Sequence, residues 1–325
     1  MRRPLALLVC LIASTAGTAR GLEPLDLDLG RLGAPSAAAW QAANPGMSQA
    51  DADALAAASK TRFALLSSEL ALAFSSPLLQ PASTTGHSGF AFDLETGYAQ
   101  VHHGVVGQKV GAVAPVDYWP THALTPNELF LTSAHVRKAF PFSVELGGRL
   151  SYLSQSSYYA AQLEGKWAPL EGLADLPDVA LRVAWQKVLG LADLDLSTTE
   201  LDVLVSKRFG VNAVTSVTPY GGARFTLLRA STPALRWATP DSPTPATPGT
   251  PAQVLAGSAA FPNVGGLFYR TTAGVRLTSY AVSLAAEATY YAGGSAGSKS
   301  PGADDYPKHY VKSSLTGSFR FGFEF

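Results

Sequence analysis

The sequence is short of thiols, of charge and of long apolar runs, and each shortage excludes a class of protein. One cysteine in 325 residues excludes a disulfide framework, a cysteine-based zinc site and thiol catalysis in any form that lacks it. Charged residues make up only 15%, with 24 basic and 24 acidic side chains, so no basic surplus is available to replace the counterions of nucleic-acid phosphates. Beyond residue 20 no stretch reaches the ~18 consecutive apolar residues of a membrane-spanning helix. We therefore expect no nucleic-acid partner and no helical membrane span.

The first nineteen residues have the three parts of an export signal. Met1-Arg2-Arg3 is a positively charged start, residues 5–13 are apolar, and Gly17-Thr18-Ala19 supplies small residues at the offset of a cleavage site. The sequence predicts a signal peptide over residues 1–19 and an exported protein. The single cysteine, Cys10, lies inside this segment, so a mature chain that begins after it has no thiol.

The apolar residues that remain follow a period of two, which is typical of strands with one apolar and one polar face. Residues 309–325 show the pattern most clearly. Their odd positions carry Val311, Leu315, Gly317, Phe319, Phe321, Phe323 and Phe325. Their even positions carry Tyr310, Lys312, Thr316, Ser318, Arg320, Gly322 and Glu324.

Nine further segments alternate in the same way, which brings the number of predicted strands to ten. A soluble β-sandwich also alternates, but these strands reach the ~10 residues that a tilted strand needs to cross a membrane, and soluble strands average about half that length. We therefore predict an all-β fold, a transmembrane antiparallel up-and-down barrel. The predicted strands are 88–102, 129–139, 141–154, 157–168, 177–189, 197–210, 214–230, 265–279, 280–292 and 309–325.

The export signal, the two-faced strands and the terminal aromatic series resemble the outer-membrane β-barrels of Gram-negative bacteria. The resemblance covers residues 88–325 and implies a place in the cell outer membrane, with membrane lipid as a partner. It also implies that the C-terminal strand is read by the barrel-assembly machinery. The residues that would carry this assembly signal are Phe319, Phe321, Phe323 and Phe325.

An even number of strands places both chain ends in the periplasm, where such barrels have short turns, and leaves the long connections outside. Segments 103–128, 231–263 and 294–308 are then outer loops, and the many prolines of 231–263 forbid a membrane strand there. A tight inner turn is expected near Ser279-Tyr280. The pair Gly221-Gly222 interrupts its strand and predicts a β-bulge.

Residues 20–87 precede the predicted barrel and contain a helix signal. Ser48 with Asp51 resembles a capping box, and the alanine-rich run after it favours a helix over 49–60. Residues 63–74 fit either a helical stripe or one face of a strand. Because an added strand would break the even parity, we expect a helix in the periplasm or plugging the lumen.

We expect function on the inward face of the barrel, because the lipid-facing side chains serve only to place the barrel in the membrane. Nine acids and ten bases fall on that face, and this balance suggests that they pair, since an unpaired buried charge is costly. The interior is then either a packed support or a narrow polar path. The residues are Asp93, Glu95, Glu145, Glu164, Asp178, Glu200, Asp202, Glu287, Glu324, Arg137, Arg149, Lys166, Arg182, Arg208, Arg224, Arg270, Arg276, Lys312 and Arg320.

The predicted barrel with a charged interior is compatible with two functions. The first is a small-solute channel or uptake barrel that the N-terminal segment plugs, with a charge-balanced lumen. The alternative is a non-conducting structural or recognition barrel that binds a surface ligand through loops 103–128 and 231–263, with Trp119 and Trp237 as adhesive aromatics.

No enzyme, metal or cofactor is expected. Asp304-Asp305 with His309 lacks the surrounding motif of a protease site and reads as a solvated turn. His102-His103 would point to opposite faces of a strand, so the pair does not readily hold one ion.

Overall fold

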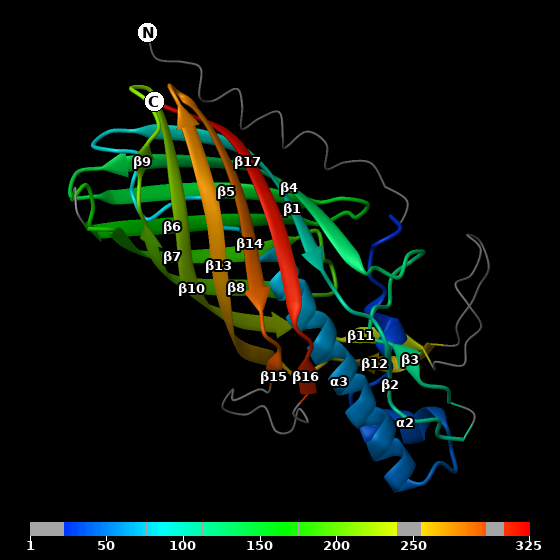
Figure 1. Ribbon diagram of the computed structural model, residues 1–325. Coiled ribbons are helices and arrows are strands. Elements are labelled where there is room, and N and C mark those ends of the chain that lie inside the picture. Colours follow the sequence, from blue (N-terminus) through cyan, green and yellow to red (C-terminus); the bar gives the residue numbers. More distant parts are fainter. Residues whose placement is uncertain (1–22, 76, 112, 174–175, 239–254, 297–308) are drawn as a thin grey trace.

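Ten long antiparallel strands of the computed structural model close into a barrel (Figure 1). The structure describes residues 23–325 apart from 76, 112, 174–175, 239–254 and 297–308, so the predicted signal peptide and Asp304-Asp305 lie outside the described residues. The barrel strands are β1 (Phe90–Gln100), β4 (Glu128–Phe140), β5 (Val144–Leu153), β6 (Tyr159–Leu170), β7 (Asp178–Leu189), β8 (Asp195–Ser206), β10 (Thr215–Ser231), β13 (Val264–Ser279), β14 (Val282–Tyr291) and β17 (Ser314–Glu324).

Each barrel strand pairs with its neighbour in the sequence, and pairing of β1 with β17 closes the barrel. The strands on either side of the longest connection also pair with each other. β10 pairs with β13 from Thr215↔Ser279 to Ala230↔Val264. The predicted all-β up-and-down barrel of ten strands is confirmed. The tight turn at Ser279-Tyr280 is present as well, with Tyr280 in the left-handed region at φ 52°.

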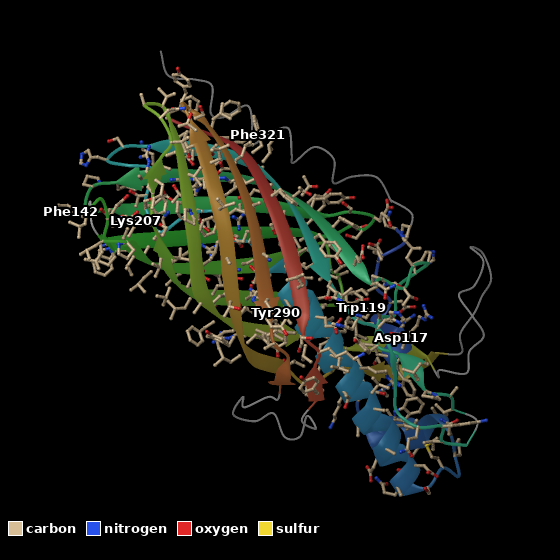
Figure 2. The ribbon with its side chains drawn as sticks, viewed as in Figure 1. Asp117, Trp119, Phe142, Lys207, Tyr290 and Phe321 are labelled. Atoms are coloured by element: carbon tan, nitrogen blue, oxygen red, sulfur yellow. The ribbon has the colours of Figure 1, made fainter. Side chains whose placement is uncertain are left out.

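The two faces of the strands differ as the alternation predicts. Large apolar side chains cover the outside of the barrel, and Tyr290 and Phe321 are 49% and 45% exposed there (Figure 2). Charged and hydroxyl side chains of the same strands are buried inside. An apolar outer surface around a polar interior is the arrangement that a bilayer requires, because lipid solvates only the first kind of surface.

The predicted bulge at Gly221-Gly222 is wrong. Register runs without a shift through both glycines against β8 and β13, and inward residues keep alternating from Ser216 to Thr226. The physical reason for the glycine lies across the strand, since a Cβ on Gly222 would come 2.4 Å from the carbonyl oxygen of Val203. The glycine therefore permits a close approach of backbones rather than an extra residue.

The prediction of one continuous strand over 309–325 is also wrong. Its first part, β16 (His309–Val311), pairs with β15 (Gly294–Ala296) in a separate small sheet, and the barrel strand begins only at Ser314. Across this break the faces exchange, so that Val311 is buried and Lys312 is exposed.

A long helix, α3 (Gln49–Phe74), enters the barrel from the end opposite Phe325 (Figure 1). Ser48 caps it by accepting a hydrogen bond from the Asp51 amide at 3.1 Å, as the capping box predicts. Residues 63–74 are helical, and the helix stops shortly before Pro77, which cannot continue it. Among the described residues, no helix has both the length and the apolar character needed to cross a membrane.

The end that α3 enters carries the long connections, so we call it the outer end and the end at Phe325 the inner end. The remaining elements are short, and most lie at the outer end. They are η1 (Leu29–Leu32), α2 (Ala37–Ala43), β2 (Val105–Val106), β3 (Val116–Asp117), β9 (Phe209–Gly210), β11 (Leu235–Ala238) and β12 (Leu255–Ala259).

Residues 23–62, 101–127 and the described parts of 232–263 pack together at the outer end, and we call this unit the head. The Leu25 amide donates to the Gln155 carbonyl at 3.0 Å, which ties the N-terminal segment to the outer β5–β6 turn. The rings of Trp40 and Trp237 lie 4.8 Å apart in its centre. Chain direction follows from this placement: the described chain starts outside, passes down the lumen and enters β1 at the inner end.

Candidate functional site

Sixteen of the nineteen predicted lumen charges are buried inside the barrel, two are exposed and one is half-buried. Arg208 is exposed in the connection after β8, because that strand ends at Ser206, and Lys312 is exposed in the break before β17. Glu324 is half-buried at the inner end, with 15% of its side chain exposed. The buried residues are Asp93, Glu95, Arg137, Glu145, Arg149, Glu164, Lys166, Asp178, Arg182, Glu200, Asp202, Arg224, Arg270, Arg276, Glu287 and Arg320.

Arg182 is a centre of this network. Its guanidinium contacts three carboxylates from neighbouring strands: Glu164 at 2.6 Å, Asp202 at 2.5 Å and Glu200 at 3.4 Å. Asp202 also pairs with Arg224 at 2.5 Å. Inward side chains on adjacent strands lie within reach of one another, so regular register alone brings these charges together.

His135 is a second centre and contacts a carboxylate through each ring nitrogen. Nδ1 lies 3.1 Å from Glu95, and Nε2 lies 3.1 Å from Glu164. Asp93, Glu95 and His135 together offer possible metal-ligating atoms within 4.8 Å of one another. Arginine already occupies these oxygens, since Arg149 lies 2.7 Å from Glu95 and the Arg137 guanidinium donates to Asp93 at 2.9 Å. The arrangement therefore favours an ion-pair network over a metal centre.

The charges also hold the chain segment that follows α3, residues 75–89, which we call the linker. Glu287 accepts hydrogen bonds from the amides of Leu78 and Leu79 at 2.9 and 2.6 Å. Lys166 donates to Gln80 and to the Ser83 carbonyl, both at 3.0 Å. The sequence suggested pairing only across the lumen. In the structure the wall charges also satisfy the backbone of a strand-free segment, which would otherwise be buried without partners.

The start of the linker is fixed in the same way, just after α3 ends. The Ser75 hydroxyl contacts both Glu200 and Arg270, and Gln186 donates to the Phe74 carbonyl at 2.7 Å. The last carbonyls of the helix are thus satisfied by the wall rather than by water.

The outer half of the lumen is apolar, which sequence reasoning missed. Phe63, Leu66 and Phe74 of α3 pack in one core cluster with inward side chains of the barrel wall, among them Leu129 and Phe268. Each such side chain contributes about 1.5–3 kcal/mol when fully buried. A signal was available, because residues 129–131 are apolar on both faces (Leu-Phe-Leu), as a strand buried on its inner face against a helix must be.

Glu69 joins α3 to the outer loop after β1. It accepts hydrogen bonds from the Tyr118 hydroxyl at 2.9 Å, the Trp119 indole at 3.1 Å and the His102 amide at 2.8 Å. Burial raises the pKa of its carboxyl, although these donors oppose the shift. Burial and the Glu69 carboxylate likewise raise the pKa of Tyr118. These contacts fix the outer loop after β1 against the helix.

The prediction that Trp119 and Trp237 are adhesive aromatics is wrong. They are only 4% and 2% exposed, because one donates to Glu69 and the other packs on Trp40. The adjacent histidines lie beyond the end of β1 rather than in a strand, so the expected strand alternation does not apply to them. His102 lies near Glu69, and His103 lies 3.2 Å from Asp117.

Comparison with known proteins finds likeness only among solved structures. No family profile matches the chain, and no curated protein matches it. The translocator domain of the autotransporter NalP from Neisseria meningitidis aligns at 13% identity and TM-score 0.33, over 74% of this chain and 89% of that one. The attachment invasion locus protein Ail of Yersinia pestis, in complex with sucrose octasulfate, aligns at 10% identity and TM-score 0.25, over 74% and 100%. The KdgM porin with oligogalacturonate aligns at 6% identity and TM-score 0.28, over 72% and 98%.

The physical character of the barrel gives its class. Ten closed antiparallel strands leave no unpaired edge, the exterior is apolar and the interior is charged. These are the properties of barrels that reside in outer membranes. The chain is an outer-membrane-type β-barrel whose lumen holds its own N-terminal segment.

Proposed function

We propose that the protein is a surface-presentation barrel, which anchors its N-terminal segment and displays the head outside the membrane. The proposal assigns it a binding and structural role and no catalysis. It takes up the second of the two functions that the sequence left open, with the head rather than two separate loops as the binding unit.

The filled lumen is the observation that supports this proposal. Residues 63–74 pack against the apolar outer half of the wall, and the linker is tied to wall charges in the inner half. Contacts of this kind cost free energy to break, since withdrawing the segment would strand buried charges such as Glu287. The segment therefore stays bound in the lumen and does not act as a displaceable plug.

The head adds a second support, because it has a core of its own. Ala34, Trp40, Leu55, Val113 and Trp237 form a buried cluster from four separate parts of the chain. Arg62 links them further, by donating to the Leu32 carbonyl at 3.1 Å and the Val106 carbonyl at 3.0 Å. A compact unit built from the N-terminal segment and two long outer loops offers a defined surface for recognition.

Cysteine labelling on intact cells tests the proposed orientation. In a Cys10→Ser background, Ala50→Cys places a thiol on the exposed start of α3, and Val211→Cys places a matched thiol in an inner turn, where Val211 is 64% exposed. A membrane-impermeant maleimide should label the first variant on intact cells and the second only after permeabilisation. Labelling in the opposite order would refute the proposal.

Planar-bilayer recording separates the proposal from the channel hypothesis. We expect no discrete conductance from the intact barrel, because α3 and the linker occupy its lumen. A variant lacking residues 23–85 that conducts would show that the filling is what blocks the path. Steady conductance or solute flux through the intact protein would favour the channel instead.

A further inference from the structure

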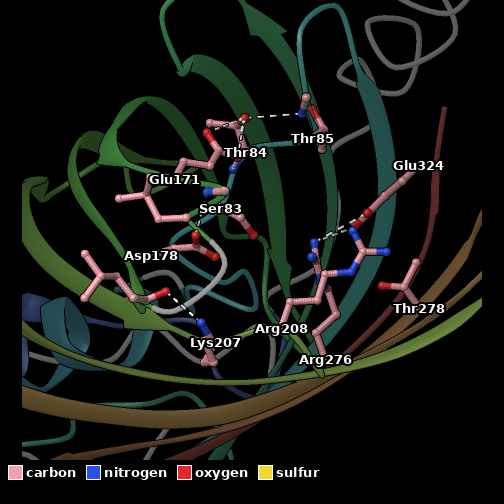
Figure 3. A pocket seen from close by; sticks show the side chains of 14 residues that line it. Ser83, Thr84, Thr85, Glu171, Asp178, Lys207, Arg208, Arg276, Thr278 and Glu324 are labelled. Atoms are coloured by element: carbon pink, nitrogen blue, oxygen red, sulfur yellow. Dashed lines mark hydrogen bonds and ion pairs between the residues drawn. The ribbon is translucent and has the colours of Figure 1, made fainter. Parts of the chain in front are cut away.

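A cavity of about 450 Å³ lies at the inner end of the barrel. Figure 3 shows the side chains that line it. The linker residues Ser83–Gly86 form one wall of it, and the connections after β6 and β8 form another. The end of β13 contributes Arg276 and Thr278, and β17 contributes Glu324.

The acidic side chains around this cavity already have partners. Glu171 accepts from the Thr84 amide at 2.6 Å and from its hydroxyl at 2.9 Å. Asp178 accepts from the Gly172 amide at 2.9 Å. Glu324 accepts from Arg276 at 3.2 Å (Figure 3). These three carboxylates thus already accept hydrogen bonds from groups in the walls of the cavity.

The unused polar groups are mostly donors. Arg276 is only 6% exposed and lines the cavity, yet its Nε–H forms no hydrogen bond among the described residues. The hydroxyls of Thr85 and Thr278 are buried and equally without a partner there. Arg208, which was expected inside the lumen, is exposed at this cavity instead, and no described carboxylate pairs with it.

Buried donors without partners need an explanation, because leaving them unsatisfied costs free energy. Here one buried guanidinium N–H, two hydroxyls and one free guanidinium border the same space. An oxyanion would satisfy these donors and would balance the charge of Arg208.

We propose that this cavity binds a small periplasmic solute that carries a phosphate or carboxylate group. Arg208 attracts the anion from the open side, and Arg276 with Thr85 and Thr278 receives its oxygens. The inference does not depend on the function proposed for the head, because the two sites lie at opposite ends of the barrel.

Calorimetric titration of the detergent-solubilised full chain with inorganic phosphate tests the proposal. We expect saturable binding that weakens about tenfold or more in Arg208→Ala, since that change removes a charge-assisted hydrogen bond. Thr278→Val, which keeps the side-chain shape and removes only the hydroxyl, should also weaken binding. Arg236→Ala is the matched control, because Arg236 is exposed on β11 in the head, and it should leave binding unchanged.

The outcomes are decisive even if one variant fails to fold. Arg208 is exposed, so its replacement leaves the barrel intact, and an unchanged thermal midpoint verifies this. Absence of saturable binding, or equal binding by wild type and Arg208→Ala, would overturn the proposal and leave a cavity that holds only water. Equal weakening by Arg208→Ala and Arg236→Ala would also overturn it, because it would indicate general charge attraction.

Discussion

Replacing Arg182 by alanine tests whether the inner lumen is a packed ion-pair network. The side chain is fully buried and contacts Glu164, Glu200 and Asp202. Its removal leaves these acids in a low-dielectric interior with one fewer cation. Removing one partner of a buried ion pair costs about 3–5 kcal/mol. For a chain of about 300 residues, with an unfolding entropy of about 2.1 cal/mol/K per residue, that loss lowers the midpoint of thermal unfolding by roughly 5–8 °C.

The same strand supplies a control. Lys187 on β7 pairs with Asp195 at 3.1 Å, but both side chains are exposed, by 41% and 56%. An exposed pair is worth ~0–1 kcal/mol, so Lys187→Ala should shift the midpoint by at most a few degrees. Comparing two cation-to-alanine changes on one strand separates burial from net charge.

A double variant identifies the source of the cost. Glu164→Gln in the Arg182→Ala background removes one stranded charge while keeping a hydrogen-bonding group beside His135. Part of the lost stability should therefore return. The assay is thermal unfolding in detergent, followed by circular dichroism or by heat-modifiable migration. If Arg182→Ala unfolds within a degree or so of wild type, these charges are solvated and the packed interior is refuted.

Three further changes test other parts of the molecule. Arg320 is buried and lies 2.9 Å from Glu324, so Arg320→Ala should cost about 3 kcal/mol, and an unchanged thermal midpoint would instead indicate a water-lined path. Replacing Phe323 and Phe325 by serine should reduce outer-membrane insertion without affecting export, and normal amounts of heat-modifiable barrel in membranes would contradict the assembly-signal hypothesis. Glu69→Gln concerns pH. Because burial raises the pKa of Glu69 above 4.5, the native state binds this proton more tightly, so stability falls as pH rises through that raised value. The variant should lose this fall when midpoints are compared from about pH 4 to about pH 8, and an unaltered profile would exclude Glu69 as its source.

The strands of the barrel wall were predictable because the alternation of apolar and polar residues can be recognised within each short stretch of sequence. The segment predicted as 177–189 is observed as Asp178–Leu189, and its inward residues include Arg182 and Gln186 as expected. The predicted lumen position fails where a strand ends. Arg208 and Lys312 lie just beyond the ends of β8 and β16, so alternation with their neighbours does not tell which way their side chains point.

The contents of the lumen were only partly predictable. The rule that the polar face points inward holds near Arg182 but fails near Leu129, where the inward face is apolar because α3 packs against it. No local pattern reports that a helix formed by residues 49–74 enters from the outer end, since this depends on contacts between residues far apart in the chain. The cavity at Arg276 also depends on such contacts.

Closure of the wall sets an order of events during assembly. β1 and β17 are the first and last barrel strands in the chain, and their pairing seals the barrel. By that time the linker must already lie inside, with the head residues beyond it on the far side. A barrel sealed while empty would have to admit a helix of 26 residues with its attached segment through a closed wall. Any domain fused ahead of residue 23 would face the same passage, so the sealing step determines what this barrel is able to carry.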